Sequence, residues 1–287
     1  MTDAACLVCG SGSNAIRKPI GAGYIARRCN SCKFTWIDRE SIKRVGIQPN
    51  YDNYDYNNRL TQQYEDMSDK YLLGFNKRVS RTVTESLSDS DKGVLKFLDV
   101  GCANGEYLRT ARQAGIKNVY GVEIDEVARK RASKHGHVVA SLAELEGMTF
   151  DIIQIKNVIS NIDDFRGFLR EYYNVLAPGG VMWVDVLNQD SLLAFVRNIL
   201  RPDFRTTGRY GPLRPPYVIN GFTKDSIACL CNELNMSVLG VETSHLGSLY
   251  VPYSPPGFLA QGVRIVSTYL GYGSMLICNL RRNGRSD

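Results

Sequence analysis

The sequence predicts an α/β fold built around a doubly wound, mostly parallel sheet. Apolar strand patterns alternate with helical patterns over 94–100, 107–114, 119–123 and 126–135. This alternation is typical of parallel sheets that carry helices on both faces. A glycine turn joins the first strand to the first helix, and the second strand ends in an acidic residue. A ligand crevice is therefore expected at the carboxyl ends of these strands.

Length and composition fit one sizeable core with a small accessory module, since the chain has 287 residues of which 44% are hydrophobic. No apolar run approaches the roughly eighteen residues that a membrane-spanning helix needs. The first residues lack the basic start and apolar stretch of a secretion signal. We therefore expect a cytoplasmic protein. The net charge of +6 is mildly basic and permits a nucleic-acid partner without requiring one.

The turn after the first strand has the features of a cofactor-binding loop. Gly101 and Gly105 bracket it, and Asp99 stands at the strand end. Glycine permits positive φ and close approach of a ligand, and the following helix points its free N–H groups at that ligand. Glu123 ends the next strand, about twenty residues after the turn, where a carboxylate can hold both hydroxyls of a ribose. Taken alone, such a turn also occurs in many α/β proteins without a cofactor.

In order and spacing, four motifs resemble those of the class I S-adenosylmethionine-dependent methyltransferases. They are residues 98–105 (LDVGCANG), the strand ending at Glu123, residues 150–153 (FDII) and residues 176–184 (LAPGGVMWV), the last as a turn and fifth strand. The resemblance implies a Rossmann-like, seven-stranded sheet that binds S-adenosylmethionine and releases S-adenosylhomocysteine. The cofactor-binding positions that it implies are Asp99, Gly101, Cys102, Ala103, Gly105, Glu123, Ile124, Ser141, Leu142, Asn157 and Tyr54.

A nicotinamide or flavin dehydrogenase is the nearest rival. Those enzymes use a G-x-G-x-x-G array that lets a helix lie close under a pyrophosphate. This chain has Gly101-x-Ala103-x-Gly105 instead. Asp99 would repel a pyrophosphate but can accept hydrogen bonds from an ammonium group or an ordered water. The turn therefore favours the methyltransferase interpretation.

Four of the eight cysteines form two tight pairs, Cys6-x-x-Cys9 and Cys29-x-x-Cys32. Two such pairs can complete a tetrahedral site for a structural Zn²⁺, and a closed four-sulfur shell leaves no position open for catalysis. We expect a zinc-ribbon-like module over 1–46, which folds with its metal. The alternatives are chance pairing and a redox role. The remaining cysteines are interpreted as small core residues.

A tyrosine-rich segment follows over 47–92 and is expected to form a helical cap and linker before the core domain, 93–287. In the resembled family such a segment often closes over the methionine part of the cofactor, which makes Tyr51, Tyr54 and Tyr64 candidates for contact. The alternative is that these tyrosines cover a half-buried surface with their hydroxyls in water.

The acceptor side offers few candidates for a catalytic base. Relatives often carry histidine in the loop after the fourth strand, but Asn161 stands near that position here, and an amide cannot take up a proton. Asp163 and Asp164 are more typical of a helix cap. His245 follows a late strand and is the candidate catalytic residue, with a hydrogen-bonded surface histidine as the alternative.

The expected lid, 188–221, contains five arginines among aromatic residues, which favours an anionic acceptor, with a solvated surface as the alternative. Most of the chain also resembles bacterial methyltransferases with an amino-terminal Cys-x-x-Cys module, associated with sugar, polysaccharide and natural-product biosynthesis. In these proteins the motif that matches residues 221–226 opens a helix, and Thr223 would cap that helix in this chain. The resemblance implies a small or carrier-linked acceptor, methylated on a hydroxyl or carbon of a glycan or secondary metabolite. An RNA methyltransferase that docks RNA through the zinc module, and a non-catalytic scaffold, are the alternatives.

Overall fold

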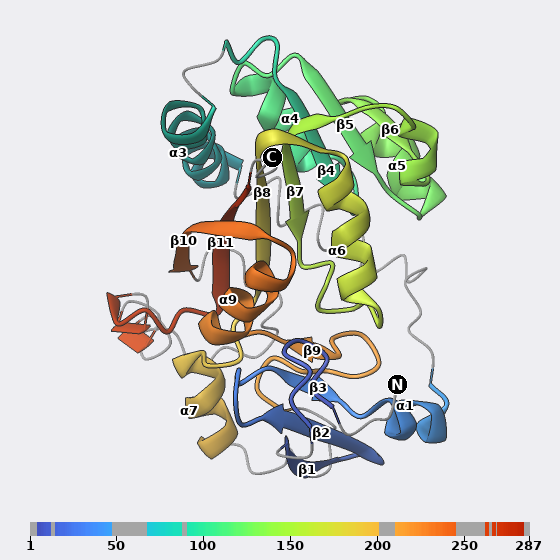
Figure 1. The fold of residues 1–287 in the computed structure, drawn as a ribbon, viewed down its shortest axis with the longest axis vertical. Coiled ribbons are helices and arrows are strands. Elements are labelled where there is room, and N and C mark those ends of the chain that lie inside the picture. Colours follow the sequence, from blue (N-terminus) through green and yellow to red (C-terminus); the bar gives the residue numbers. More distant parts are fainter. Residues whose placement is uncertain are drawn as a thin grey trace.

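The computed structural model describes residues 5–12, 15–47, 68–87, 91–200, 210–244, 262–263, 266–267 and 269–283. These residues form two sheets (Figure 1). The larger sheet has seven strands and is covered by helices, and the smaller sheet has four strands. The smaller sheet lies at the end of the molecule toward which β7 and β8 run (Figure 1).

The larger sheet has the strand order β10-β11-β8-β7-β4-β5-β6. Its strands are β4 (Lys96–Val100), β5 (Asn118–Val122), β6 (His137–Val139), β7 (Phe150–Lys156), β8 (Leu176–Leu187), β10 (Met236–Ser244) and β11 (Met275–Arg282). The pairs from β6 through β8 are parallel, and β11 runs antiparallel to both β8 and β10. This confirms the predicted Rossmann-like, mostly parallel seven-stranded sheet.

Alternate residues of the central strands enter two cores, because successive side chains of a strand point to opposite faces. On one face Phe97, Ile152 and Trp183 pack beneath α3 (Ser68–Ser86), α4 (Glu106–Gln113) and α5 (Glu126–Ala132). On the other face Leu98 and Ile153 pack beneath α6 (Phe165–Asn174) and α9 (Lys224–Glu233). These two layers hold the carboxyl ends of the parallel strands in fixed positions.

Side-chain caps define where several helices begin. The Asp125 carboxylate accepts from Ala128 N at 2.7 Å, and Asp164 does the same for Gly167 N at 2.9 Å. Thr223 caps α9 through Ser226 N at 3.2 Å, as predicted. Of the two aspartates interpreted as helix caps, Asp164 is one, whereas Asp163 forms an ion pair with Arg39.

Most predicted boundaries of these elements agree with the structure within two residues, and two differ more. The helix expected over 126–135 ends at Ala132, and residues 133–135 form turns before β6. The turn expected at the start of the fifth strand lies inside β8, which begins at Leu176. The register between β7 and β8 shifts there, and Gly179 has a φ of +75°. A β-bulge thus accommodates the Pro-Gly-Gly segment without ending the strand.

The smaller sheet joins two distant parts of the chain. Its first three strands are β1 (Ala15–Gly21), β2 (Tyr24–Cys29) and β3 (Thr35–Ile37), followed by α1 (Arg39–Val45). Its fourth strand is β9 (Asn220–Gly221), which comes from the segment expected to form the lid. The same segment contains α7 (Leu192–Leu200). The predicted amino-terminal module thus shares a sheet with a part of the chain that lies between β8 and α9.

Among the residues described, no helix combines the length and apolar character needed to cross a membrane.

Candidate functional site

The turn between β4 and α4 combines three residues in the left-handed region. Gly101, Ala103 and Gly105 have φ values of +70°, +46° and +87°. Gly101 N and Cys102 N both donate to Val122 O, at 2.8 and 3.2 Å, which ties the turn to the end of β5. Ala103 lies exposed at the tip. The turn therefore presents backbone, without a large side chain, at the carboxyl edge of the sheet.

At both glycines of the turn, a neighbouring residue leaves no room for a Cβ. A Cβ on Gly101 would lie 2.8 Å from Val158 Cγ2, and one on Gly105 would lie 2.8 Å from Ala132 Cα. The left-handed φ expected at both glycines is confirmed, and their role in ligand approach stays a prediction. Their missing Cβ atoms also let the loop after β7 and helix α5 pack closely against the turn.

Glu123 links the turn to the start of α5. Its Oε2 accepts from Ala103 N at 2.8 Å, and its Oε1 accepts from Asp125 N at 3.0 Å. These bonds hold the carboxylate at the end of β5, beside the tip of the turn. Ile124 follows with 80% of its surface exposed, so an apolar side chain stands next to the acid.

Asp99 and Cys102 are buried beneath the turn. Gln154 Nε2 donates to Asp99 Oδ1 at 3.1 Å, and burial raises the pKa of the Asp99 carboxyl to about 7. The Cys102 Sγ lies against Gly121 in the core, and burial raises the pKa of its thiol. The Cys102 sulfur is therefore buried away from the open edge of the sheet.

The turn after β6 is closed by a local cap. Ser141 precedes the short 3₁₀ helix η1 (Leu142–Leu145), and Glu144 Oε1 accepts from Ala140 N at 2.9 Å and Ser141 N at 3.0 Å. The Glu144 carboxylate is therefore engaged by its own backbone. Leu142 is buried, with 8% of its surface exposed.

The loop after β7 carries a strained residue and unsatisfied polar atoms. Asn157 has a φ of +58°, and its N–H donates to Asp185 O at 2.8 Å. Asn157 Oδ1, Ser160 Oγ and Asn161 Oδ1 are buried and have no hydrogen-bond partner among the described residues. Such groups are rare in folded proteins, and they accumulate where a ligand or water binds. Ser160 was not predicted as a site residue, although a polar residue close to two asparagines after a buried strand is a signal for one.

A buried charged cluster lies under this loop and was also missed. Lys156 Nζ donates to Tyr107 OH, and it lies 4.5 Å from the centre of the Tyr107 ring. Arg78 of α3 forms an ion pair with Asp185 of β8 at 2.9 Å and stacks on Trp183 at 4.5 Å. Burial raises the pKa of Tyr107. No local pattern predicts these pairs, because their members are far apart in the sequence.

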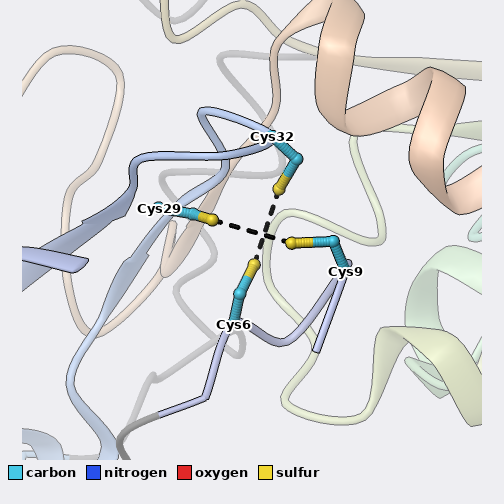
Figure 2. A group of neighbouring side chains, drawn as sticks. All are labelled: Cys6, Cys9, Cys29 and Cys32. Atoms are coloured by element: carbon cyan, nitrogen blue, oxygen red, sulfur yellow. Dashed lines mark hydrogen bonds between the residues drawn. The ribbon is translucent and has the colours of Figure 1, made fainter. Parts of the chain in front are cut away.

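The four paired cysteines converge from two turns of the amino-terminal module (Figure 2). All four Sγ atoms lie within 4.8 Å of one another, with Cys6 3.5 Å from Cys32 and Cys9 3.6 Å from Cys29. Zinc–sulfur bonds of about 2.3 Å in a tetrahedron place sulfurs about 3.8 Å apart. These separations fit one metal ion and are far longer than a disulfide bond.

Hydrogen-bonding groups lie around three of the four sulfurs of the cluster, those of Cys6, Cys9 and Cys29. Val8 N donates to Cys6 Sγ at 3.4 Å, and Ser11 Oγ lies 3.1 Å from Cys9 Sγ and 3.2 Å from Cys29 Sγ. The hydrogen bond with Cys32 lowers the pKa of Cys6 to about 5 and raises that of Cys32.

Several sequence-predicted residues lie outside the described residues. These are the candidate base His245 and the cap tyrosines Tyr51, Tyr54 and Tyr64. Of the five lid arginines, Arg214 has a described side chain. The structure brings the turn together with Glu123 and with the loop that carries Asn157, and it packs the cysteine cluster into the core beneath α6 and α9.

Comparisons with known proteins agree with this geometry. A family model described as a methyltransferase domain matches residues 72–240, more than half of the chain. The chain is 30% identical over 105 residues to a ubiquinone biosynthesis O-methyltransferase of Parvibaculum lavamentivorans, covering 33% of this chain and 41% of that protein. It is 30% identical over 138 residues to the protein of the same name from a Chelativorans species, covering 42% and 54%. The matches thus span about half the length of these curated relatives.

Among solved structures, the chain resembles the plantazolicin methyltransferase BpumL, in complex with a pentazolic desmethylPZN analog and S-adenosylhomocysteine. The TM-score is 0.51 at 14% identity, and the match covers 81% of this chain and 93% of that one. At this identity the likeness shows a shared fold.

Proposed function

The chain belongs to the methyltransferase-domain family, and from this premise we propose that it transfers a methyl group from S-adenosylmethionine to a small or carrier-linked acceptor. The observation that carries the proposal is the turn 101–105 held beside Glu123 by the bond from Ala103 N. Exposed backbone, a carboxylate and an apolar side chain lie together at the carboxyl ends of β4 and β5, which suits an adenosine-bearing ligand.

Each group of this edge has a proposed task. Glu123 accepts from the ribose hydroxyls, while Ile124 and Leu142 flank the adenine. Asp99 accepts from the ammonium group, directly or through water, because it lies beneath the turn with only Gln154 as a hydrogen-bond donor among the described residues. The backbone of Gly101 and Ala103 lies against the cofactor. When bound, S-adenosylmethionine supplies a methyl group on an already activated sulfonium centre.

The loop 157–164 forms the acceptor side in this proposal. It contains no histidine, and its buried Asn157, Ser160 and Asn161 oxygens are free to meet polar groups of a ligand. In-line displacement depends mainly on alignment and desolvation, so positioned amides can serve the reaction without a base. The names of the curated relatives favour a hydroxyl acceptor, whose proton must then leave to solvent or to a base outside this loop during the transfer.

We assign the Cys6, Cys9, Cys29 and Cys32 cluster to a structural Zn²⁺. The four sulfurs fill a tetrahedral shell, and a module this small buries too little apolar surface to fold alone.

The experiment is transfer of radiolabelled methyl from S-adenosylmethionine into an extract of the source cell, followed by nuclease digestion and organic partition. Label in nuclease-resistant small or lipid-linked material supports the proposal. Label that is lost on ribonuclease digestion establishes the RNA alternative instead.

The matched variants are Glu123→Gln and Glu146→Gln. The first halves the number of acceptor oxygens beside Ala103 and should weaken S-adenosylhomocysteine binding about tenfold or more. The second makes the same change on an exposed side chain and should bind normally. Equal affinity of both variants would refute the cofactor site, and absence of label in every fraction would refute methyl transfer.

A further inference from the structure

We infer that Asn220 is a positioning residue, through which the amino-terminal module holds the acceptor-side loop 157–164 against the cofactor turn. The inference rests on the proposed function for its catalytic meaning, whereas the contacts are independent of it. Asn220 belongs to the two-residue strand β9, is fully buried, and lies between the module and the loop.

Both the amide nitrogen and the amide oxygen of the Asn220 side chain form hydrogen bonds. Its Nδ2 donates to Ile159 O at 3.1 Å and to Ile162 O at 2.7 Å. Its Oδ1 accepts from Arg39 NH2 at 3.1 Å. Both amide hydrogens therefore bind the loop, and the amide oxygen binds the module. An asparagine side chain is suited to this because it has two donors and one acceptor in a fixed plane.

The backbone around Asn220 makes the same connection. Ile219 N and Asn220 N both donate to Ser160 O, at 2.9 and 3.0 Å. On the other side, Ile37 N donates to Ile219 O at 2.9 Å, and Trp36 pairs with Asn220 in the small sheet. Residues 219 and 220 thus bind three carbonyls of the loop, and Asn220 begins the strand β9 that pairs with β3 of the module.

A second contact ties the loop to the module directly. Arg39 forms an ion pair with Asp163, and its guanidinium also approaches Asp163 O at 3.4 Å. Arg39 follows Asp38, which caps α1 through Ser41 N at 3.0 Å. The Arg39 guanidinium therefore contacts both Asn220 and the far end of the loop from one helix end.

The loop in turn contacts the cofactor turn. Val158 Cγ2 fills the space that a Cβ on Gly101 would occupy, so a shift of the loop moves an atom packed on the turn. The buried Asn157 and Asn161 oxygens lie on either side of Val158 and Ser160 in the chain. The position of these oxygens relative to the cofactor turn therefore depends on Asn220.

The test compares Asn220→Asp with Asn232→Asp. The first variant keeps the size and the oxygen that faces Arg39 but removes both donors to the loop. The second makes the same change on an exposed residue of α9. Hydrogen exchange is measured with S-adenosylhomocysteine bound. Exchange in 157–164 is expected to rise on the order of tenfold in the first variant, because two hydrogen bonds are lost.

Three readouts separate positioning from general stability. In Asn220→Asp, exchange in β4 and β7 should stay at wild-type values, and methyl transfer into the extract should fall about tenfold or more, a larger loss than the loss of affinity for S-adenosylhomocysteine. Equal exchange of the loop in wild type and variant would overturn the inference. So would faster exchange throughout the sheet. If wild type transfers no methyl, the proposed function fails, and the exchange result still decides the role of Asn220.

A second pair covers the case in which Asn220→Asp does not fold. Arg39→Met removes the donor to Asn220 and the ion pair with Asp163 while keeping the apolar stem. Arg170→Met makes the same change on an exposed arginine of α6. Faster exchange of 157–164 in the first variant alone supports the inference, and equal exchange in both overturns it.

Discussion

The two halves of the proposed site are assembled in different ways. The cofactor half is the turn 101–105 with Glu123, and the acceptor half is the loop 157–164 with the residues that hold it. The cofactor half joins neighbours in sequence, since Glu123 binds Ala103 twenty positions away. The acceptor half joins distant segments, with 181 positions between Arg39 and Asn220 and 191 between Cys32 and Thr223, whose hydroxyl donates to Cys32 O. One βαβ unit therefore builds the cofactor half, whereas the acceptor half depends on docking of the amino-terminal module.

The largest effect is expected from Cys29→Ser, which removes one ligand of the proposed metal site. Metal binding supplies on the order of 10 kcal/mol of apparent folding free energy to small zinc modules. We expect bound zinc, measured by atomic emission, to fall from one equivalent to none, and the module to lose protection from proteolysis. Affinity for S-adenosylhomocysteine should persist, because no cofactor residue lies in the module.

Cys229→Ser is the control, since Cys229 lies outside the cluster and is half-buried. It should retain zinc. Unchanged zinc in Cys29→Ser would refute the four-cysteine site, and loss of cofactor binding along with zinc would show that the two halves are not independent.

This difference also explains which parts could be predicted. The turn 101–105, Glu123 and the sheet were predictable because their signals are local: periodicity, glycine at a bend, and an acid at a strand end. Strand β9 could not be predicted, because Asn220–Gly221 has no strand pattern and its pairing partner β3 lies far away in the sequence. The packing that excludes a Cβ at each glycine was likewise not predictable, because Val158 and Ala132 become neighbours of the turn only through folding.

The Arg78–Asp185 pair tests whether distant contacts also stabilise the sheet. Arg78→Met leaves the Asp185 carboxylate buried without its cation, which should lower the free energy of unfolding by about 3–5 kcal/mol. Urea denaturation measures this value. Adding Asp185→Asn should restore part of it, and Arg81→Met, on the exposed side of α3, should leave stability unchanged. Equal midpoints for Arg78→Met and Arg81→Met would show that the buried pair contributes nothing.

Gly105→Ala tests whether packing against α5 requires glycine at position 105 of the turn. The new methyl would lie 2.8 Å from Ala132 Cα at a φ of +87°, so packing and backbone strain both oppose it. Gly147→Ala is the matched control, because Gly147 has a φ of +76° with open space around it. The control should cost about 1 kcal/mol, and Gly105→Ala about 2–4 kcal/mol. Equal urea midpoints for Gly105→Ala and Gly147→Ala would show that packing does not require glycine at position 105.

The smallest expected effect is a pH dependence in the cofactor half. Burial raises the pKa of Asp99 to about 7, with Gln154 and Lys156 opposing the rise and Glu123 and Asp185 adding to it. The carboxyl is therefore mostly protonated at pH 6 and charged at pH 8. Only the charged form accepts hydrogen bonds from an ammonium group with both oxygens, so affinity for S-adenosylhomocysteine should rise with pH, by at most about tenfold per unit below 7.

Stability without ligand should change in the opposite direction. The folded state holds its proton more tightly than the unfolded state, so stability falls as pH rises from the unfolded pKa of about 4 through 7. Calorimetric titration at pH 6, 7 and 8 measures the affinity, and urea midpoints measure the stability. Asp99→Asn should flatten both profiles, because its amide does not titrate. A pH profile of binding that is identical in wild type and Asp99→Asn would place the ammonium group away from Asp99. The cofactor half would then be defined by Glu123 and the turn alone.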